Sequence, residues 1–233
     1  MHREISGLSS MATRAILAAL SEHIRGDRGI PVRFESAGGV DIARRVRAGA
    51  AADLLVLADD AMAALAAEGH LLDGTVRPLW ISQVVAAVPA DAPPPTFASE
   101  ADLRAALRGA ERIAYSTGPS GTAVLHLVDR LGLADTVGGR LVQAPPGVPV
   151  GSMLASGDAD LAFQQHSELM DLPGVRILGP LPGDAAITST FTGAVLSTST
   201  EPDRAAAVLD LLSSPTATRT AQAKGMRAAI EQI

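Results

Sequence analysis

The sequence contains no cysteine, few aromatic residues and no excess of positive charge. Without cysteine, the chain forms no disulfide, no thiolate metal site and no cysteine nucleophile. Aromatic residues make up only 3% of the chain, which argues against surfaces that stack single-stranded bases. The formal net charge is −6 at pH 7, which argues against binding to a nucleic acid duplex. Nucleic acid is therefore not an expected partner.

Long hydrophobic runs are also missing. The longest apolar stretches, such as LLVLA and VVAAV, have the length of strands, so membrane insertion is not expected. The first residues, MHREISGLSSMATR, lack the basic stretch followed by an apolar stretch that marks a secretory signal. We therefore expect a monomer that is cytoplasmic as the sequence stands, and periplasmic if the sequence is a mature form.

What the sequence does contain is an alternation of strand-like and helix-like segments over 233 residues. Hydrophobic residues make up 47%, enough for one large domain or for two lobes. The alternation predicts the α/β class, with a mostly parallel sheet flanked by helices in each lobe. Two long extended segments, 79–89 and 187–197, supply two crossings between the lobes. We expect lobe 1 to comprise residues 1–80 and 190–233, and lobe 2 to comprise residues 81–189.

Four loops of this pattern share one composition: SGLSSMAT (6–13), ESAGGVD (35–41), STGPSGTA (116–123) and APPGVPVG (144–151). Each follows an expected strand and precedes an expected helix, the place where ligands bind in open α/β sheets. The helix behind each loop offers unpaired N–H groups and the positive end of its dipole to an anion. Capping alone explains any single loop of Ser, Thr and Gly. Four such loops together favour a small anionic ligand.

Four side chains near these loops have both a functional and a structural interpretation. Arg14 either pairs with a ligand carboxylate or is an exposed helix residue. Tyr115, at the end of an expected strand, is a candidate to line the site. His166 either supplies a base or satisfies a local turn, and Glu168 either supplies a base or is a solvated or capping carboxylate. The five histidines show no metal-type spacing, so neither a metal nor a cofactor is expected.

Five stretches of the sequence resemble a known family: SSMATRAIL, FESAGGVDIARRVRAGAAADLLVLADDAMAALAAEGHL, IAYSTGPSG, LASGDADLAFQQHSEL and SPTATRTAQAKGM. The chain is similar, over essentially its whole length, to the molybdate-binding-protein group of the type II periplasmic binding proteins, the solute receptors of ABC transporters. The resemblance implies two α/β lobes with two hinge crossings, a small anion in the cleft and, for an exported form, an ABC permease as partner. The candidate ligand-binding residues are Ser9, Ser10, Arg14, Ser36, Gly38, Gly39, Tyr115, Ser120, Gly121, Thr122, Val148, Gln165 and His166.

The resemblance assigns direct contacts to a few of these positions: Ser10, Ser36 or Gly38, Ser120, and Val148 through its backbone N–H. The fifth contact in molybdate receptors is a Tyr, and Gln165 stands at that position here. An amide side chain both donates and accepts hydrogen bonds, which suits a ligand with mixed groups such as an organic carboxylate.

An enzyme also belongs to the resembling family. Aconitate isomerase moves a double bond in a tricarboxylic acid, a reaction that needs a base for a carbon-bound proton and donors for the resulting charge. His166 or Glu168 would be the catalytic base in this alternative. A ligand sensor without transport or catalysis is a third interpretation, because fold alone does not decide function.

Overall fold

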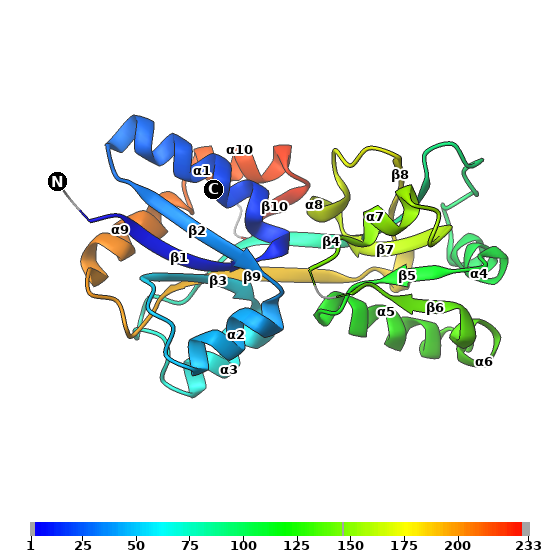
Figure 1. Cartoon of the computed structure of the whole chain (residues 1–233), viewed down its shortest axis with the longest axis horizontal. Helices are drawn as coiled ribbons and strands as arrows, with labels where there is room; N and C mark the ends of the chain where they lie inside the picture. Colours follow the sequence, from blue (N-terminus) through cyan, green and yellow to red (C-terminus); the bar gives the residue numbers. More distant parts are fainter. Residues whose placement is uncertain (1–2, 146, 230–233) are drawn as a thin grey trace. The chain divides into compact units, whose positions relative to one another are not determined.

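The computed structural model describes residues 3–145 and 147–229 and divides the chain into two compact units (Figure 1). Unit 1 comprises Met1–Ser82 and Ser189–Ile233, and unit 2 comprises Gln83–Thr188. The chain passes from unit 1 to unit 2 within strand β4 (Arg77–Pro89). It returns at the start of strand β9 (Thr188–Val195), so the two expected extended segments are these two strands.

Unit 1 is built on a mixed sheet. Strand β1 (Ile5–Ser10) pairs in parallel with β2 (Val32–Ala37) and with β3 (Leu54–Ala58), while β3 pairs antiparallel with β9. Strand β10 (Met226–Ala228), which the sequence did not indicate, pairs antiparallel with the first part of β4. The parallel strands all end at one edge of the sheet, where the loops after β1 and β2 lie.

Helices cover both faces of this sheet (Figure 1). The helical segments of unit 1 are the 3-10 helix η1 (Met11–Thr13) and the α-helices α1 (Arg14–Arg28), α2 (Gly39–Arg47), α3 (Asp59–Ala67), α9 (Pro202–Leu211) and α10 (Pro215–Ala223). Helices α1, α9 and α10 pack on one face, and α2 and α3 on the other. Among the described residues, no helix is long and apolar enough to cross a membrane.

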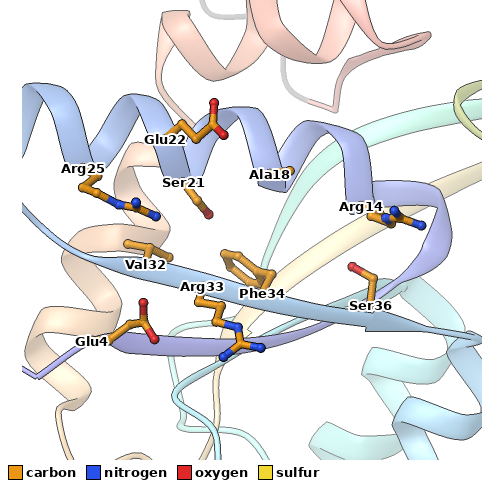
Figure 2. Close-up of a pocket in the computed structure, with 10 residues that line it drawn as sticks. All are labelled: Glu4, Arg14, Ala18, Ser21, Glu22, Arg25, Val32, Arg33, Phe34 and Ser36. Carbon is orange, nitrogen blue, oxygen red and sulfur yellow. The ribbon is translucent and has the colours of Figure 1, made fainter. Parts of the chain in front are cut away.

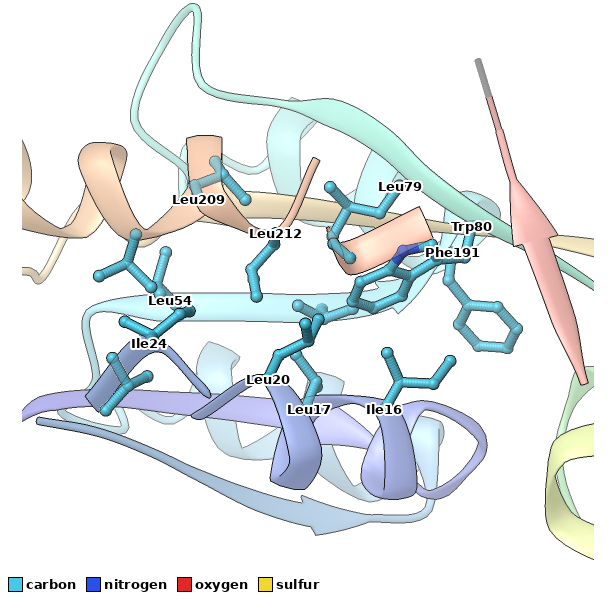
Figure 3. Packing of buried hydrophobic residues seen from close by; sticks show 14 of the residues in the cluster. Ile16, Leu17, Leu20, Ile24, Leu54, Leu79, Trp80, Phe191, Leu209 and Leu212 are labelled. Carbon is cyan, nitrogen blue, oxygen red and sulfur yellow. The ribbon is translucent and has the colours of Figure 1, made fainter. Parts of the chain in front are cut away.

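The core under α1 follows the apolar spacing of the sequence. Ile16, Leu17, Leu20 and Ile24 form one buried face of α1 and pack with Trp80 and other buried residues (Figure 3). Full burial of such a side chain stabilises the fold by about 1.5–3 kcal/mol. The helix ends at Gly29, which has a φ of 65° and caps the helix in the left-handed conformation.

Unit 2 also has a mixed sheet. Strand β7 (Leu161–Gln165) pairs in parallel with β5 (Ile113–Tyr115) and antiparallel with β4. Strand β6 (Leu141–Gln143) extends the parallel part beside β5, and β8 (Val175–Pro180) pairs antiparallel with β4. The expected parallel pairs are present in both units, and the crossing strands add the antiparallel ones.

The helical segments of unit 2 also lie on both faces of its sheet (Figure 1). They are α4 (Glu100–Gly109), α5 (Pro119–Arg130), α6 (Ala134–Val137), η2 (Gly138–Arg140), α7 (Val150–Ala155), α8 (His166–Leu169) and η3 (Gly183–Ala185). Helix α4 begins with a capping box, because Ser99 and Asp102 exchange side-chain-to-backbone hydrogen bonds.

Candidate ligand-binding site

The ends of β1 and β2 bring two serines of unit 1 together. Ser9 lies opposite Ser36 in the parallel register, and their hydroxyl oxygens are 2.7 Å apart. One hydroxyl donates to the other, so the pair still has one O–H group to donate and lone pairs to accept a hydrogen bond from a ligand. The pairing of these two loops follows from the parallel sheet, which the sequence predicted.

Ser10 ends β1 and precedes η1. Its side chain is only 8% exposed, and its hydroxyl has no hydrogen-bond partner among the described residues. Leaving a buried polar group without a partner costs about 1–3 kcal/mol. A bound ligand with an acceptor or donor at this point would remove that cost.

The loop after β2 carries two glycines, Gly38 and Gly39, at positions whose φ angles other residues could also adopt. Gly38 caps α2 with a φ of −57°, and no atom lies within 4 Å of the position that a Cβ would take there. Gly39, the first residue of α2, has only a Leu57 methyl at 4.0 Å from such a Cβ. The absence of side chains leaves the first turn of α2 open to an approaching group, whose charge the helix dipole favours if it is negative.

The loop after β5 in unit 2 also has a pair of hydroxyls. The oxygens of Ser116 and Ser120 are 2.9 Å apart. Pro119 has no N–H, and the amides of Gly121 and Thr122 both donate to the carbonyl of Gly118, at 2.9 and 3.2 Å. The expected set of open amides at the start of α5 is therefore reduced to that of Ser120, which has no partner in the described part of the chain.

Gly121 is explained by packing. A Cβ at this position would lie 1.8 Å from the carbonyl oxygen of Ser116 and 3.1 Å from the Tyr115 ring. Only glycine allows the loop to pass this close to the first turn of α5. Gly121 thus supports the Ser116–Ser120 pair, and its own N–H is already used within the turn.

The loop before α7 differs from the expectation. The amide of Val148 donates to the carbonyl of Pro145 at 3.0 Å, and the amide of Val150 donates to Oε1 of Gln164 at 3.0 Å. The turn closes on itself, so the Val148 N–H is not an open donor in this structure. Pro146, inside the same expected loop, lies outside the described residues.

Strand β7 ends in two glutamines with different roles. Gln164 bridges two elements: its Oε1 accepts from Val150, and its Nε2 donates to Oε2 of Glu168 at 2.7 Å. Gln165 follows on the other side of the strand, is 3% exposed and precedes α8, which starts at half-buried His166. Glu168, a candidate base from the sequence, is coupled to Gln164 by this hydrogen bond. Two adjacent polar residues ending an apolar strand were the signal that could have singled out Gln164.

Glu168 has a strongly shifted acidity. Burial raises the pKa of its carboxyl from 4.5 to about 7, and the hydrogen bond from Gln164 opposes this shift only in part. A carboxyl with a pKa near neutrality can take and return a proton at physiological pH. Glu168 is therefore the residue of unit 2 best suited to act as a base.

The raised pKa of Glu168 predicts how the stability of the fold depends on pH. Between pH 4.5 and 7 the folded protein keeps the Glu168 proton and the unfolded chain does not, so stability falls as pH rises through this window. Glu168→Gln removes the titration and keeps a side-chain acceptor for Gln164. We expect the variant to gain about 2–3 kcal/mol relative to the natural chain between pH 4.5 and pH 8. Urea unfolding of both proteins at several pH values measures this, and a difference that is constant with pH would contradict the shift.

The arginines near these loops separate into two groups. Arg45 pairs with Glu35 at 2.7 Å and Arg47 with Glu68 at 2.7 Å, so both charges are already matched on the helix surface. Arg14 starts α1, is exposed, and lines a pocket of unit 1 together with Ser36. Of these arginines, Arg14 is the one that lies beside the end of β2.

The family of the chain is shown by its sequence. Residues 5–227 match the family described as bacterial extracellular solute-binding proteins. The chain belongs to this family. An aconitate isomerase of Pseudomonas sp. is 30% identical over 176 residues, which cover 76% of this chain and 67% of that enzyme.

Solved structures of other binding proteins share the fold. The periplasmic molybdate-binding protein of Azotobacter vinelandii has a TM-score of 0.81 at 21% identity, covering 98% of this chain and 100% of that one. The sulfate-binding protein of Mycobacterium tuberculosis has a TM-score of 0.80 at 17% identity, covering 99% and 88%. The type II periplasmic-binding-protein fold and the resemblance to molybdate-binding proteins, both expected from the sequence, are confirmed.

Proposed function

We propose that this solute-binding protein captures a small anion with the loops at the carboxyl ends of its strands. The observation that carries the proposal is the buried Ser10 hydroxyl, which lacks a partner at the end of β1. Beside it, the Ser9–Ser36 hydroxyl pair and the open first turn of α2 offer further donors. Neutral hydroxyls and amides of this kind hold an anion without a fixed positive charge.

The name of the family supports an exported protein. The family is described as extracellular, and the Azotobacter relative is periplasmic. We propose the periplasm as the compartment of the mature chain and an ABC permease as its partner.

Ser10→Ala tests the site directly. Removing the hydroxyl should weaken anion binding by about 1–3 kcal/mol, roughly 5- to 150-fold, because a ligand group loses its partner. Ser82→Ala is the matched control, since it deletes another buried hydroxyl without a partner among the described residues, on β4 and outside the strand-end loops. Calorimetric titration measures both, and Ser120→Ala in the same series tests the loop of unit 2. Unchanged affinity in Ser10→Ala would exclude the proposed site.

Thermal-shift measurements with a panel of anions test which class of anion the protein binds. Thermal shifts with molybdate, tungstate, sulfate, citrate, cis-aconitate and trans-aconitate distinguish a tetrahedral oxyanion from an organic acid. A ligand at about 100 times its dissociation constant should stabilise the fold by about 2.7 kcal/mol. Because Gln165 stands where molybdate receptors have Tyr, we propose that the organic acids give the larger shifts. A response to molybdate or tungstate alone would make the Gln165 change a tolerated one.

A second function is favoured by Glu168 and by the similarity to an aconitate isomerase. In this proposal the Glu168 carboxylate takes a proton from a carbon beside a ligand carboxylate. The electron pair shifts toward that carboxylate, and the protonated Glu168 returns the proton at the other end of the allylic system. The double bond moves, no atom is gained or lost, and no cofactor is needed.

Glu168→Gln also tests this second function. Loss of a general base should slow isomerisation by about 10²–10⁴-fold and leave ligand binding within a few fold. Proton NMR of cis-aconitate or trans-aconitate incubated with each protein follows the reaction. Binding of these acids without turnover by the natural chain would leave solute capture as the function.

A further inference from the structure

A groove runs along α1 and β2 within unit 1. Its volume is about 350 Å³, within the range of small-molecule sites. Strand β2 ends the order of hydrogen-bonded strands, so no further described strand pairs along its outer side. The lining residues are Glu4, Arg14, Ala18, Ser21, Glu22, Arg25, Val32, Arg33, Phe34 and Ser36 (Figure 2).

The groove is built from two repeating patterns. Positions 14, 18, 21 and 25 recur every three or four residues and form one stripe of α1. Positions 32, 34 and 36 alternate along β2 and share one face of the sheet. The stripe of α1 lies beside its buried apolar face, and therefore overhangs the edge strand.

The floor of the groove is apolar. Val32 is buried, Phe34 is half-buried, and Ala18 is too short to fill the space above them. A Cβ at Gly7 on β1 would lie 2.2 Å from the Phe34 ring, so the ring lies against bare backbone of the neighbouring strand. An apolar ligand body would bury this surface.

The rim of the groove carries unpaired positive charge. Arg14, Arg25 and Arg33 form no ion pair among the described residues, whereas nearby Arg45 is paired with Glu35. Two acidic side chains, Glu4 and Glu22, also line the groove, so its positive groups exceed its negative ones by one. This balance suits a ligand with a single negative charge and disfavours a dianion.

Ser21 adds an unmet hydrogen-bonding group. Its side chain is 7% exposed, and its hydroxyl has no partner in the described part of the chain. Figure 2 shows this hydroxyl directed from α1 toward the strand, on the same side of the groove as Arg25. A guanidinium and a hydroxyl together recognise a carboxylate well.

We propose that the end of this groove around Ser21 and Arg25, away from Arg14 and Ser36, is a second ligand site for a small monocarboxylate with an aromatic or branched aliphatic body. Arg25 and Ser21 hold the carboxylate, and Phe34, Val32 and Ala18 contact the body. This proposal goes beyond solute capture at the strand ends and does not depend on it.

The probe is 3-phenylpropionate, with uncharged 3-phenylpropanamide as its control, in an NMR-detected titration of the full chain. Ala18→Phe fills the groove from an exposed helix position, and Arg25→Gln removes the guanidinium. Ala101→Phe, at an exposed position of α4 in unit 2, is the matched control for the added ring.

We expect saturable binding of the carboxylate that both groove variants weaken by at least about tenfold and Ala101→Phe leaves unchanged. The amide should bind at least about tenfold more weakly than the carboxylate. Absence of saturable binding, equal binding of the amide, or equal affinity in Ala18→Phe and Ala101→Phe would overturn the proposal. Thermal shifts with the anion panel, recorded for Ala18→Phe and Ser10→Ala, report the strand-end site separately, so failure of one proposal does not resemble failure of the other.

Discussion

Asp53→Asn should lower the free energy of unfolding by about 3 kcal/mol. The Asp53 side chain is fully buried and accepts hydrogen bonds from Arg3 at 2.5 and 2.6 Å, from the Ser6 amide at 2.9 Å and from the Ser199 hydroxyl at 2.8 Å. It thereby ties the start of β1 to the segment after β9. Asn places an amide where these donors converge, and it leaves Arg3 without its charge partner.

The pH dependence of this effect has a definite sign. Burial raises the pKa of Asp53, but the hydrogen bonds from Arg3, Ser6 and Ser199 outweigh burial and hold it below its ordinary value of 3.8. The stabilisation is therefore present above pH 3.8 and is lost as pH falls through the still lower pKa of the folded state.

Urea unfolding at pH 7 and at low pH measures both statements. The matched control is Asp41→Asn, which breaks an exposed ion pair with Arg44 and should change stability by less than about 1 kcal/mol. Equal losses of unfolding free energy in the two variants would show that the buried hydrogen bonds of Asp53 stabilise the fold no more than an exposed ion pair does.

Gly121→Ala is the second change with a large expected effect. The new methyl group would lie 1.8 Å from the Ser116 carbonyl oxygen, so the loop after β5 or the start of α5 has to shift. We expect a loss of about 1–3 kcal/mol in the stability of the fold, together with weaker ligand binding if the Ser116–Ser120 pair contributes to it. Thermal unfolding and the titrations described above measure the two effects.

Gly109→Ala is the control for Gly121→Ala within unit 2. Gly109 lies in α4, and no atom is within 4 Å of the position of its missing Cβ. Alanine is the better helix former by about 1 kcal/mol, so this variant should be as stable as the natural chain or more stable. A Gly121→Ala protein that unfolds like Gly109→Ala would show that the loop adapts freely.

Much of the fold was predictable because local signals were strong. The apolar residues of α1 recur at helical spacing, and the residues of β4 and β9 form long extended segments. Ser99 and Asp102 stand three positions apart, the spacing of a capping box. Strand β10 was missed because three residues are too short for a period to show. Its pairing depends on β4, which lies far away in the sequence.

The candidate site was predictable at the level of loops and less so at the level of atoms. Parallel pairing, which the sequence indicated, places Ser9 opposite Ser36 in the observed register. Hydrogen bonds within a loop decide which of its amides remain available to a ligand, and the Val148 N–H already donates to the carbonyl of Pro145. Alternation along β7 decides that the side chain of Gln164 points to the face where it donates to Glu168. Neither feature is encoded in the composition of a short segment.

The division of the chain also sets an order of folding. Unit 2 is one continuous stretch, whereas the core of unit 1 joins α1 and β3 to residues of β9, α9 and α10 that are synthesised last. Domains generally fold as units. Unit 2 can therefore complete its core while unit 1 still waits for Val195, Leu209 and Leu212. Until those residues arrive, the apolar face of α1 lacks part of its packing partners and stays exposed to water and to other chains.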